Sequence, residues 1–433
     1  MSTHTYPRRR FVSLMLAAPF FGSAWMAGAE APAEAVITKF GAKADGSTVN
    51  TKAIQAAIGH LAARGGGTVV VPQGVFVSGA LFFKPKVNLR LEAGGVLQCS
   101  TDMANFPVQR TRIEGHFEAK FNPALINATN CDGFTMTGEG TLDGAGRPIW
   151  DEFWKERNAA PNPRNFPNLG IPRARLALIQ GSRGVRVEGI TFKDSQFWNL
   201  HLYNNDGVEV RNVRFQVPDD YRQAPSTDGI DVDSSQNVTV DGCFFSVTDD
   251  CIALKGSKGP NAMEDKSSPP VEHIRVRNCV YKRGGGVLTL GSEATIVRDV
   301  VVENCRIVGN VRVATLKLRP DTPQHYEDIT FRNITSEGDA GQILAVQPWS
   351  QYFNLQGEAP PKSVVSNLSL IGAKGKFAAF GVIRPNPGQT EITNVLLKDF
   401  DVELPEGRDT LKAEGVTGLK FENVVVNGKT ETA

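Results

Sequence analysis

The sequence predicts an all-β, single-domain fold in which short strands coil into a parallel β-solenoid, with one helix capping its N-terminal end. Nine segments of nine residues share one design: alternating apolar residues, a small or polar turn, and another apolar pair. Period-two alternation predicts strands with one buried face, and a strand repeat of about 20–40 residues without long helices predicts a parallel solenoid. A β-propeller would need four strands per unit and a more regular period. The segments are 184–192, 207–215, 237–245, 273–281, 299–307, 328–336, 367–375, 394–402 and 418–426.

One helix is expected, over residues 50–63, before the main repeats begin. Its apolar residues recur at the spacing of a single helix face, and three glycines at 65–67 would end it. A solenoid must cover the open end of its core, so we interpret this helix as a cap without chemistry. The apolar residues of that face are Ala53, Ile54, Ala57, Ile58 and Leu61.

Two other segments depart from the strand pattern. Residues 144–172 contain several prolines together with Trp150, Trp154 and Arg157, and we interpret them as a loop excursion on one side of the coil stack. Residues 347–353 form a polar, aromatic loop after a late coil, of the kind that rims a cleft.

The N-terminal segment predicts export. Arg8, Arg9 and Arg10 precede an apolar run over 11–27, followed by small residues, which is the layout of a signal peptide. The paired arginines also resemble a twin-arginine signal. The alternative is a membrane anchor, but the run is short for a bilayer span. We therefore expect an export signal over 1–29 and a catalytic solenoid over 30–433, in the periplasm or outside the cell and without membrane attachment after signal removal.

Charge and cysteine usage exclude further classes. The 47 basic residues nearly balance the 46 acidic ones, so the charge does not indicate nucleic-acid binding. Cys243, Cys279 and Cys305 occupy one equivalent slot in three successive repeats, which favours stacked buried thiols over disulfide bridges. No cysteine or histidine spacing predicts a zinc site, and we expect no metal or other cofactor.

Three aspartates are the strongest functional signal. Asp228 lies 21 residues before Asp249, and Asp250 follows directly, so about one turn of the solenoid would stack the two segments. Carboxylates held this close raise the pKa of one group while the others stay ionised. That arrangement is what acid/base hydrolysis of a glycosidic bond requires. A lone aspartate would more often be a turn residue, but three in one patch favour catalysis.

Short motifs along nearly the whole chain carry a family resemblance. The most specific are 227–232, 249–250 and 291–293, and 140–144 and 197–201 continue the resemblance. The opening segments, 40–46 and 66–72, are shared by many β-helix proteins. On these motifs the chain resembles glycoside hydrolase family 28, the polygalacturonases and their pectin-degrading relatives. The resemblance implies a right-handed parallel β-helix and an enzyme that cleaves galacturonate-containing pectin.

The resemblance also implies roles for the three aspartates. Asp249 matches the general acid that protonates the leaving oxygen, and Asp228 and Asp250 match the pair that activates the attacking water. Family members invert the anomeric centre, which typically needs about 6.5–9.5 Å between carboxyl groups. Because the other two carboxylates crowd Asp249, we expect Asp249 to hold its proton. Side chains that splay apart from stacked coils would leave room for the water.

Three positions depart from the family motifs. Ser226 stands where the family has asparagine, Gly285 aligns with its histidine, and Thr315 with its arginine. The missing histidine and arginine normally position the acid and the substrate carboxylate. Their loss points to a variant substrate, such as rhamnogalacturonan or a decorated or oligomeric pectin.

Four residues are candidates for substrate binding. Lys317 remains as a cation for a uronate carboxylate, and Arg319, on the same strand face, either replaces the missing arginine or forms a surface ion pair. His201 either contacts substrate or is satisfied inside the solenoid wall. Trp198 either stacks on a sugar ring or packs in the core.

Asp231 and Asp233 share one face of the strand that follows Asp228. We expect Asp231 to contribute to the electrostatics of the site and Asp233 to be solvated.

Two other functions remain open at this point. A calcium-dependent pectate lyase could use the aspartate cluster as its metal site. A non-catalytic carbohydrate-binding solenoid would be consistent with the lost histidine and arginine. The expected partner is a pectic polysaccharide or oligosaccharide, and we expect a monomer.

Overall fold

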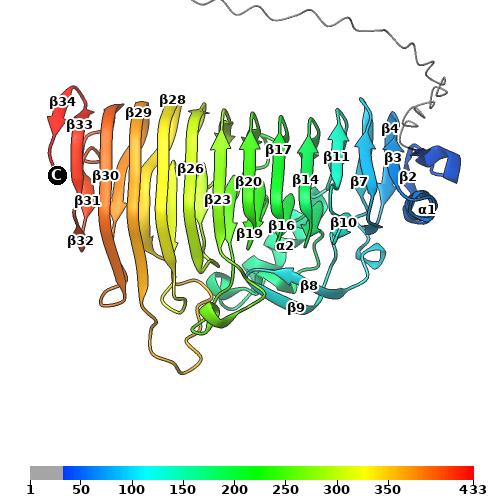
Figure 1. The fold of residues 1–433 in the computed structure, drawn as a ribbon, viewed down its shortest axis with the longest axis horizontal. Coiled ribbons are helices and arrows are strands. Elements are labelled where there is room, and N and C mark those ends of the chain that lie inside the picture. The colour runs from blue at the N-terminus through cyan, green and yellow to red at the C-terminus, as the bar shows by residue number, and fades with distance from the viewer. Residues whose placement is uncertain (1–32) are drawn as a thin grey trace, which may run out of the picture. The chain divides into compact units, whose positions relative to one another are not determined.

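The computed structural model describes residues 33–433, which form a right-handed parallel β-helix. Strands of neighbouring coils pair in parallel, and three stacks of strands run along the coil axis. Figure 1 shows the coils following one another from helix α1 (Thr51–Ala63) to the last strands, β33 (Lys420–Val426) and β34 (Lys429–Glu431). The fold class predicted from the period-two repeats is therefore confirmed. The expected export signal, 1–29, lies outside the described residues.

One stack, called the site stack below, carries the functional residues. Its strands are β5 (Leu81–Phe83), β10 (Ile126–Thr129), β13 (Ala177–Gln180), β16 (Leu200–Tyr203), β19 (Ile230–Asp233), β22 (Ile252–Lys255), β25 (Leu288–Leu290), β27 (Ala314–Leu318) and β31 (Leu411–Ala413), with the ends of β28 (His325–Pro348) and β29 (Ser363–Ile383).

The other two stacks complete the coils. The second contains β1 (Glu34–Val36), β3 (Gly67–Val71), β6 (Val87–Leu91), β11 (Thr135–Gly138), β14 (Arg183–Glu188), β17 (Asp206–Arg211), β20 (Gln236–Asp241), β23 (Val271–Arg277), β26 (Ile296–Ile307), β28, β29, β30 (Thr390–Glu403), β32 (Val416–Thr417) and β33. The third contains β2 (Asp45–Val49), β4 (Gly74–Ser78), β7 (Gly95–Cys99), β12 (Thr141–Asp143), β15 (Thr191–Lys193), β18 (Arg214–Gln216), β21 (Phe244–Ser246), β24 (Val280–Arg283) and the end of β26.

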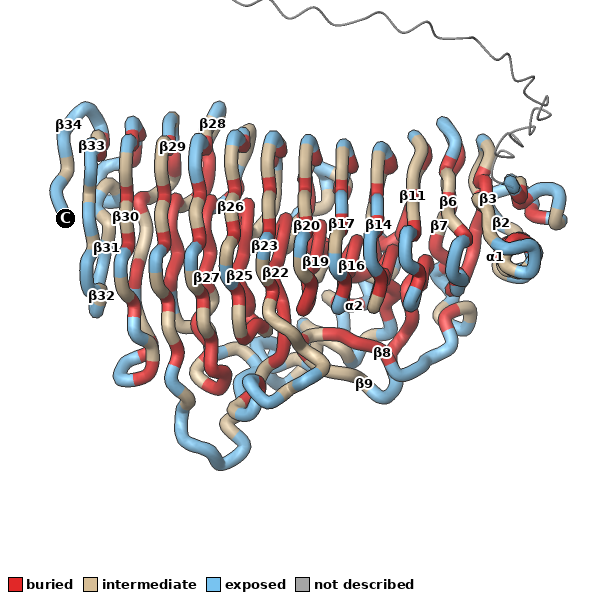
Figure 2. The backbone as a smooth tube through the Cα atoms, viewed as in Figure 1, coloured by how far each residue is buried: buried red, intermediate tan, exposed pale blue. Residues whose placement is uncertain are grey.

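The core lies between the stacks, and equivalent residues of successive coils stack on one another there. The rings of Phe192, Phe215, Phe245 and Tyr281 form a ladder with centroids 5.0, 5.1 and 5.0 Å apart. Each such pair adds about 0.5–1.5 kcal/mol beyond its burial. Figure 2 shows buried residues, in red, recurring in successive coils along the solenoid. All six cysteines are free and buried, which agrees with the stacked thiols expected from their spacing.

The corners between strands use the left-handed backbone conformation. Asn212, Asn278 and Asn304 recur there with φ angles of 53°, 56° and 55°. Asparagine tolerates this conformation better than most residues, because its short side chain bonds to nearby backbone.

Helix α1 covers the N-terminal end of the core, as the sequence predicts. Ile54, Ala57, Ile58 and Leu61 are its buried residues, and the helix contacts β1, β3, β5 and β6. The apolar spacing therefore identified both the helix and its buried face.

The excursion over 144–172 is not only a loop. It contains helix α2 (Arg147–Ala159) and two short 3-10 turns, Pro163–Asn165 and Asn168–Gly170. Pro148 lies in the first helical turn, where its missing N–H costs nothing, so it starts the helix instead of preventing it. A second excursion is the antiparallel hairpin of β8 (Gln109–Ile113) and β9 (His116–Phe121), which the repeats did not indicate. Two further 3-10 turns, Ile37–Phe40 and Met103–Asn105, lie among the early coils, and a third, Ala262–Glu264, follows β22.

Candidate active site

The three aspartates come together at the start of two neighbouring strands of the site stack. Ile230 of β19 pairs with Ile252 of β22, so one coil spans 22 residues here, and Asp228 is level with Asp250. The Gly229 N–H donates to the Asp250 carbonyl at 2.9 Å, which fixes that register. Carboxylate oxygens of Asp228, Asp249 and Asp250 all lie within 4.8 Å of one another. The stacking expected from the 21-residue interval is therefore present.

Each of the three carboxylates has a different environment. Asp250 is 4% exposed and accepts from Lys317 Nζ at 2.7 Å and from Thr289 Oγ1 at 2.8 Å. Asp249 is the most exposed of the three, and its Oδ1 accepts from the Asp250 N–H at 3.0 Å. Asp228 is 3% exposed, and Lys255 Nζ lies 4.0 Å from its Oδ2.

These environments separate the pKa values of the trio. Burial and the neighbouring Asp250 raise the pKa of Asp249, which agrees with its expected role as the proton-holding acid. Burial also opposes ionisation of Asp250, but the ammonium of Lys317 outweighs it and lowers the pKa of that carboxyl. Burial, with Asp249 and Asp231 nearby, raises the pKa of Asp228 well above its usual value. The expectation that Asp228 is simply ionised is thus at odds with its surroundings, and its charge depends on nearby cations.

Lys255 is one such cation, and the sequence motifs did not indicate it. Its Nζ lies 3.6 Å from Asp231, 3.7 Å from Glu293 and 4.7 Å above the ring of Trp198. Burial works against the charge of this lysine, yet the surrounding carboxylates raise its pKa well above the usual value. A strand-face analysis would have found it, because Lys255 pairs in register with Asp233 and points to the same side.

Asp231 lies 3.6 Å from Lys255, among the charged residues of the site, and its electrostatic role stays a prediction. Its side chain is fully buried, and neither carboxylate oxygen has a hydrogen-bond partner among the described residues. Burial raises the pKa of Asp231 well above its usual value, whereas Lys255 acts in the opposite direction.

Asp233 is not solvated, contrary to the expectation from strand alternation. Arg112, from strand β8, donates to it at 2.9 Å, and both side chains are fully buried. The hairpin β8–β9 covers this part of the site stack, and a contact 121 residues apart is invisible to local patterns.

His201 belongs to the same buried network and does not line the pocket. Its Nδ1 lies 2.8 Å from a donating nitrogen of Arg175, and its Nε2 lies 3.3 Å from Asp233. Because arginine only donates, the ring is neutral with its proton on Nε2. Burial lowers the pKa of His201 to about 4. The structure therefore does not support His201 as a substrate contact. The alternative role fits instead: both ring nitrogens have partners inside the solenoid.

Arg319 also lies outside the pocket in front of the aspartates. It is 1% exposed, and its guanidinium forms two hydrogen bonds of 2.8 Å with Asp321. Neither expectation for it is met, since the pair with Asp321 is buried instead of exposed and Arg319 is not among the residues that line the pocket. Trp198 and Lys317, by contrast, both line the pocket.

The position of Gly285 explains how the site is built without a histidine there. A Cβ atom at Gly285 would lie 2.7 Å from Asp250 Oδ1, so Asp250 occupies the space that a side chain would need. The hydroxyl of Thr315, which replaces the family arginine, is buried without a hydrogen-bond partner among the described residues. Lys317 and Thr289 thus position Asp250 in this chain.

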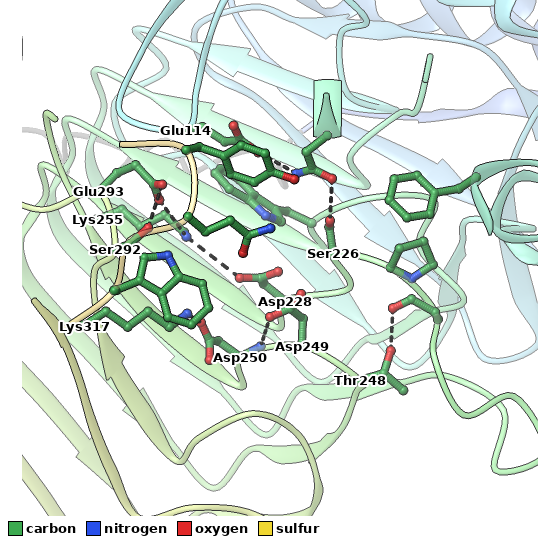
Figure 3. A pocket seen from close by; sticks show the side chains of 18 of the residues that line it. Glu114, Ser226, Asp228, Thr248, Asp249, Asp250, Lys255, Ser292, Glu293 and Lys317 are labelled. Carbon is green, nitrogen blue, oxygen red and sulfur yellow. Dashed lines mark hydrogen bonds and ion pairs between the residues drawn. The ribbon is translucent and has the colours of Figure 1, made fainter. Parts of the chain in front are cut away.

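A cavity of about 400 Å³ lies in front of the trio, and Figure 3 shows the aspartates and lysines converging on it. Helix α2 contributes Phe153, Trp154 and Arg157 to its wall, and the loop after β28 contributes Trp349, Gln351 and Tyr352. The loop 347–353 therefore does rim a cleft, as its composition indicated. Sequence patterns gave no reason to place α2 there.

Two pocket cations remain outside the ion pairs of residues 33–433. Arg157 of α2 donates only to the Pro163 carbonyl, at 3.0 Å, and Lys258 forms neither an ion pair nor a hydrogen bond within that range. By contrast, Lys255 and Lys317 face the aspartates directly. Lys255 and Lys258 together outweigh burial and lower the pKa of Glu293, which lines the same pocket, so Lys258 also acts on one of the pocket's own carboxylates.

The trio is a poor match for calcium. Calcium takes six to eight oxygen ligands, whereas Lys317 already donates to one Asp250 oxygen and Lys255 lies beside Asp228. A divalent cation at the trio would be repelled by the ammonium groups of Lys317 and Lys255.

Comparison with known proteins decides the family. The model of the glycosyl hydrolases family 28 matches residues 68–426. The chain belongs to family 28. It is therefore a glycoside hydrolase, and the resemblance seen in the aspartate motifs is confirmed.

Two relatives and one solved structure are similar to most of this chain. A "Polygalacturonase" of Gossypium hirsutum is 23% identical over 91% of this chain and 90% of its own length. A "Probable polygalacturonase" of Vitis vinifera is 26% identical over 70% of this chain, but the match spans only 60% of that protein. The crystal structure of an exopolygalacturonase from Thermotoga maritima has a TM-score of 0.70 at 24% identity, covering 93% of this chain and 95% of that one.

Proposed function

We propose that this family 28 enzyme hydrolyses glycosidic bonds in galacturonate-containing pectin. The observation that carries the proposal is the convergence of Asp228, Asp249 and Asp250 on one pocket floor, with oxygens within 4.8 Å. Polygalacturonase relatives support the same substrate class. The lost histidine and arginine favour a variant substrate, such as rhamnogalacturonan or decorated or oligomeric pectin.

In this proposal the three aspartates divide the chemistry. Asp249 donates its proton to the leaving glycosidic oxygen as the bond to the anomeric carbon breaks. Asp228 and Asp250 take the proton of a water whose oxygen bonds to that carbon, so one water is consumed per cut. The raised pKa of Asp249 and the lowered pKa of Asp250 support the roles of these two residues. Asp228, whose burial raises its pKa, acts as a base only while the nearby ammonium of Lys255 keeps it ionised.

Inversion is proposed from the family resemblance and not from the spacing. The nearest carboxylate oxygens lie within 4.8 Å, closer than the about 6.5–9.5 Å between carboxyl groups that is typical of inverting enzymes. Proton NMR of the first product should show the β-anomer if an α-linked galacturonan is inverted. An α-anomer appearing first would contradict inversion.

Substrate acidity is supported by two pocket cations that form no ion pair within residues 33–433. Arg157 and Lys258 line the pocket outside any ion pair of the described chain, so a uronate carboxylate can bind there instead of at the Thr315 position. The aromatic side chains of Trp154, Trp198 and Trp349 line the same pocket and offer faces for sugar rings.

We further propose that the enzyme acts in the periplasm or outside the cell, on the basis of the charged and apolar segment 1–29. Within residues 33–433 the structure contains no helix with the length and apolarity needed to span a bilayer. N-terminal sequencing of the exported protein should find a start near residue 30.

The decisive experiment is a panel of pectic fragments with and without rhamnose, with products resolved by chromatography. The native enzyme should cleave at least one galacturonate-containing fragment, and Asp249→Asn should lower the rate by about 10²–10⁴-fold. Asp206→Asn, an exposed aspartate of β17, is the matched control and should keep full activity. Full activity in Asp249→Asn would contradict the assignment of the acid.

The same panel tests the two other functions. A lyase would give products that absorb in the ultraviolet through a new double bond. A non-catalytic solenoid would bind fragments without releasing products.

A further inference from the structure

The pocket is bordered by three segments that come from distant parts of the chain. They are the tip of the hairpin β8–β9, the excursion over 144–172, and the loop over 349–356. Figure 1 shows the hairpin, α2 and the long loop that follows β28 projecting on the same side of the coils. Hydrogen bonds join these segments to one another.

Asn168 joins the excursion to the hairpin. Its side-chain amide donates to Glu114 at the hairpin tip, at 2.5 Å. Its side-chain oxygen Oδ1 accepts from Arg173 at 2.8 Å, and Arg173 is fully buried. A buried guanidinium therefore fixes the residue that holds the two segments together.

Tyr352 joins the excursion to the late loop. Its hydroxyl donates to the Phe166 carbonyl at 2.7 Å, and Gln351 donates to the Arg164 carbonyl at 3.4 Å. These contacts link residues 186 and 187 positions apart, from coils on either side of the aspartate-bearing coils.

The late loop is itself anchored to the solenoid. Arg319 donates to the Tyr352 carbonyl at 3.1 Å, and Asp321 accepts from the Asn354 N–H at 2.6 Å. The buried Arg319–Asp321 pair thus holds the loop in place, which gives a structural role to an arginine that does not reach the trio.

Helix α2 continues the border with Phe153, Trp154 and Arg157. Trp154 Nε1 donates to the Gln223 carbonyl at 2.6 Å, and Trp150 Nε1 donates to the Ser195 carbonyl at 2.9 Å. Gln223 also lines the pocket. The border therefore runs through bonded segments from Gln223 along α2 and the 3-10 turns to Tyr352 and Glu114.

From this border, which is called the wall below, we infer that the site receives the end of an acidic sugar chain and not its interior. The inference rests on the proposed function. A chain passing through would have to displace a wall held by the hydrogen bonds of Trp154, Asn168 and Tyr352. The cavity of about 400 Å³ is also near the lower end of the about 300–1,000 Å³ of ligand pockets, which suits a few terminal units. Each cut consumes one water and needs no other co-reactant.

The test is the course of product release from a galacturonate polymer or its oligomers. The native enzyme should release the smallest product from the first minutes, while the viscosity of the polymer falls slowly compared with the gain of reducing ends. Early viscosity loss with a ladder of intermediate oligomers would overturn the inference and leave the proposed function intact. Failure to cleave any galacturonate fragment would instead contradict the proposed function.

A wall-opening variant tests the cause. Tyr352→Ala combined with Gln351→Ala removes both side-chain bonds to the excursion, and it should increase the share of internal cuts. Phe82→Ala, an exposed aromatic residue of β5 far from the pocket, is the control and should keep the native product course. An unchanged product course in a folded double variant would overturn the wall as the cause. Tyr352→Phe, which deletes only the hydroxyl, provides a milder second variant and should shift the products in the same direction.

Discussion

Replacing Lys255 with methionine should move the acidic limb of the pH–activity profile to higher pH. Asp228 must be ionised to help activate water, and its burial beside Asp249 and Asp231 already raises its pKa. Lys255 is the cation that opposes this rise, with its Nζ 4.0 Å from Asp228. Without it, Asp228 binds its proton more tightly, and the base is lost at pH values where the native enzyme works.

The size of the shift follows from the distance. For unit charges at the 4.0 Å of this pair, Coulomb's law gives about 1 kcal/mol in water and about 4 kcal/mol at an effective dielectric constant of ~20. At about 1.36 kcal/mol per unit, this corresponds to roughly 0.8 to 3 pKa units. Asp231 also loses its partner and will bind a proton, which removes one repelling charge from Asp228. We therefore expect the limb to move by about one unit, near the lower value.

The assay is kcat/KM on galacturonate oligomers across the acidic and neutral range, with thermal unfolding measured in parallel. Removing one partner of a buried ion pair typically costs about 3–5 kcal/mol of stability, so folding must be verified at each pH. Lys258→Met is the matched control, because this lysine lines the same pocket without pairing to the trio. It should raise KM and leave the limb in place. An unmoved limb in folded Lys255→Met would refute the electrostatic reasoning.

Three other predictions concern the fold and the metal. Arg112→Met should lower the free energy of unfolding by about 3–5 kcal/mol, because it leaves Asp233 buried without its partner; denaturant unfolding checks this, and Arg110→Met on the exposed face of the same strand should cost far less. Thiol titration of the denatured, unreduced protein should find six free sulfhydryls, and a smaller number would indicate bridges. Chelator should leave activity unchanged, since Lys317 and Lys255 compete with any cation at the trio; loss of activity would favour a metal-dependent reaction.

Features that repeat from coil to coil could be predicted from the sequence. The alternation of apolar residues identified the strands, and the equivalent slots of Cys243, Cys279 and Cys305 identified a continuous core. The aspartates followed from the same logic, because an interval close to one coil places Asp228 level with Asp250. The apolar period and the coil length are local properties of the sequence, so they can be predicted without coordinates.

Features that depend on one segment docking on another could not be predicted. Asp233 is on the outward face of its strand, and only the hairpin carrying Arg112 turns that face into a buried one. The predictions for Arg319 were wrong for the same reason. Its partners Asp321 and Tyr352 lie outside the strand pattern, where the late loop is anchored. Helix α2 was missed because its apolar stripe is short and surrounded by prolines.

The distribution of charge explains how the site can lack the family histidine and arginine. Two lysines, at 255 and 317, face the carboxylates of the trio and set which of them are ionised, so no further cation is required on the floor. A side chain at Gly285 would collide with Asp250 in this arrangement, which makes the glycine part of the same solution. Arg157 of the wall and Lys258 of the loop after β22 then supply positive charge at other places in the pocket. If substrate carboxylates bind there, specificity in this enzyme is determined by the excursions that form the pocket, while the solenoid beneath supplies the chemistry.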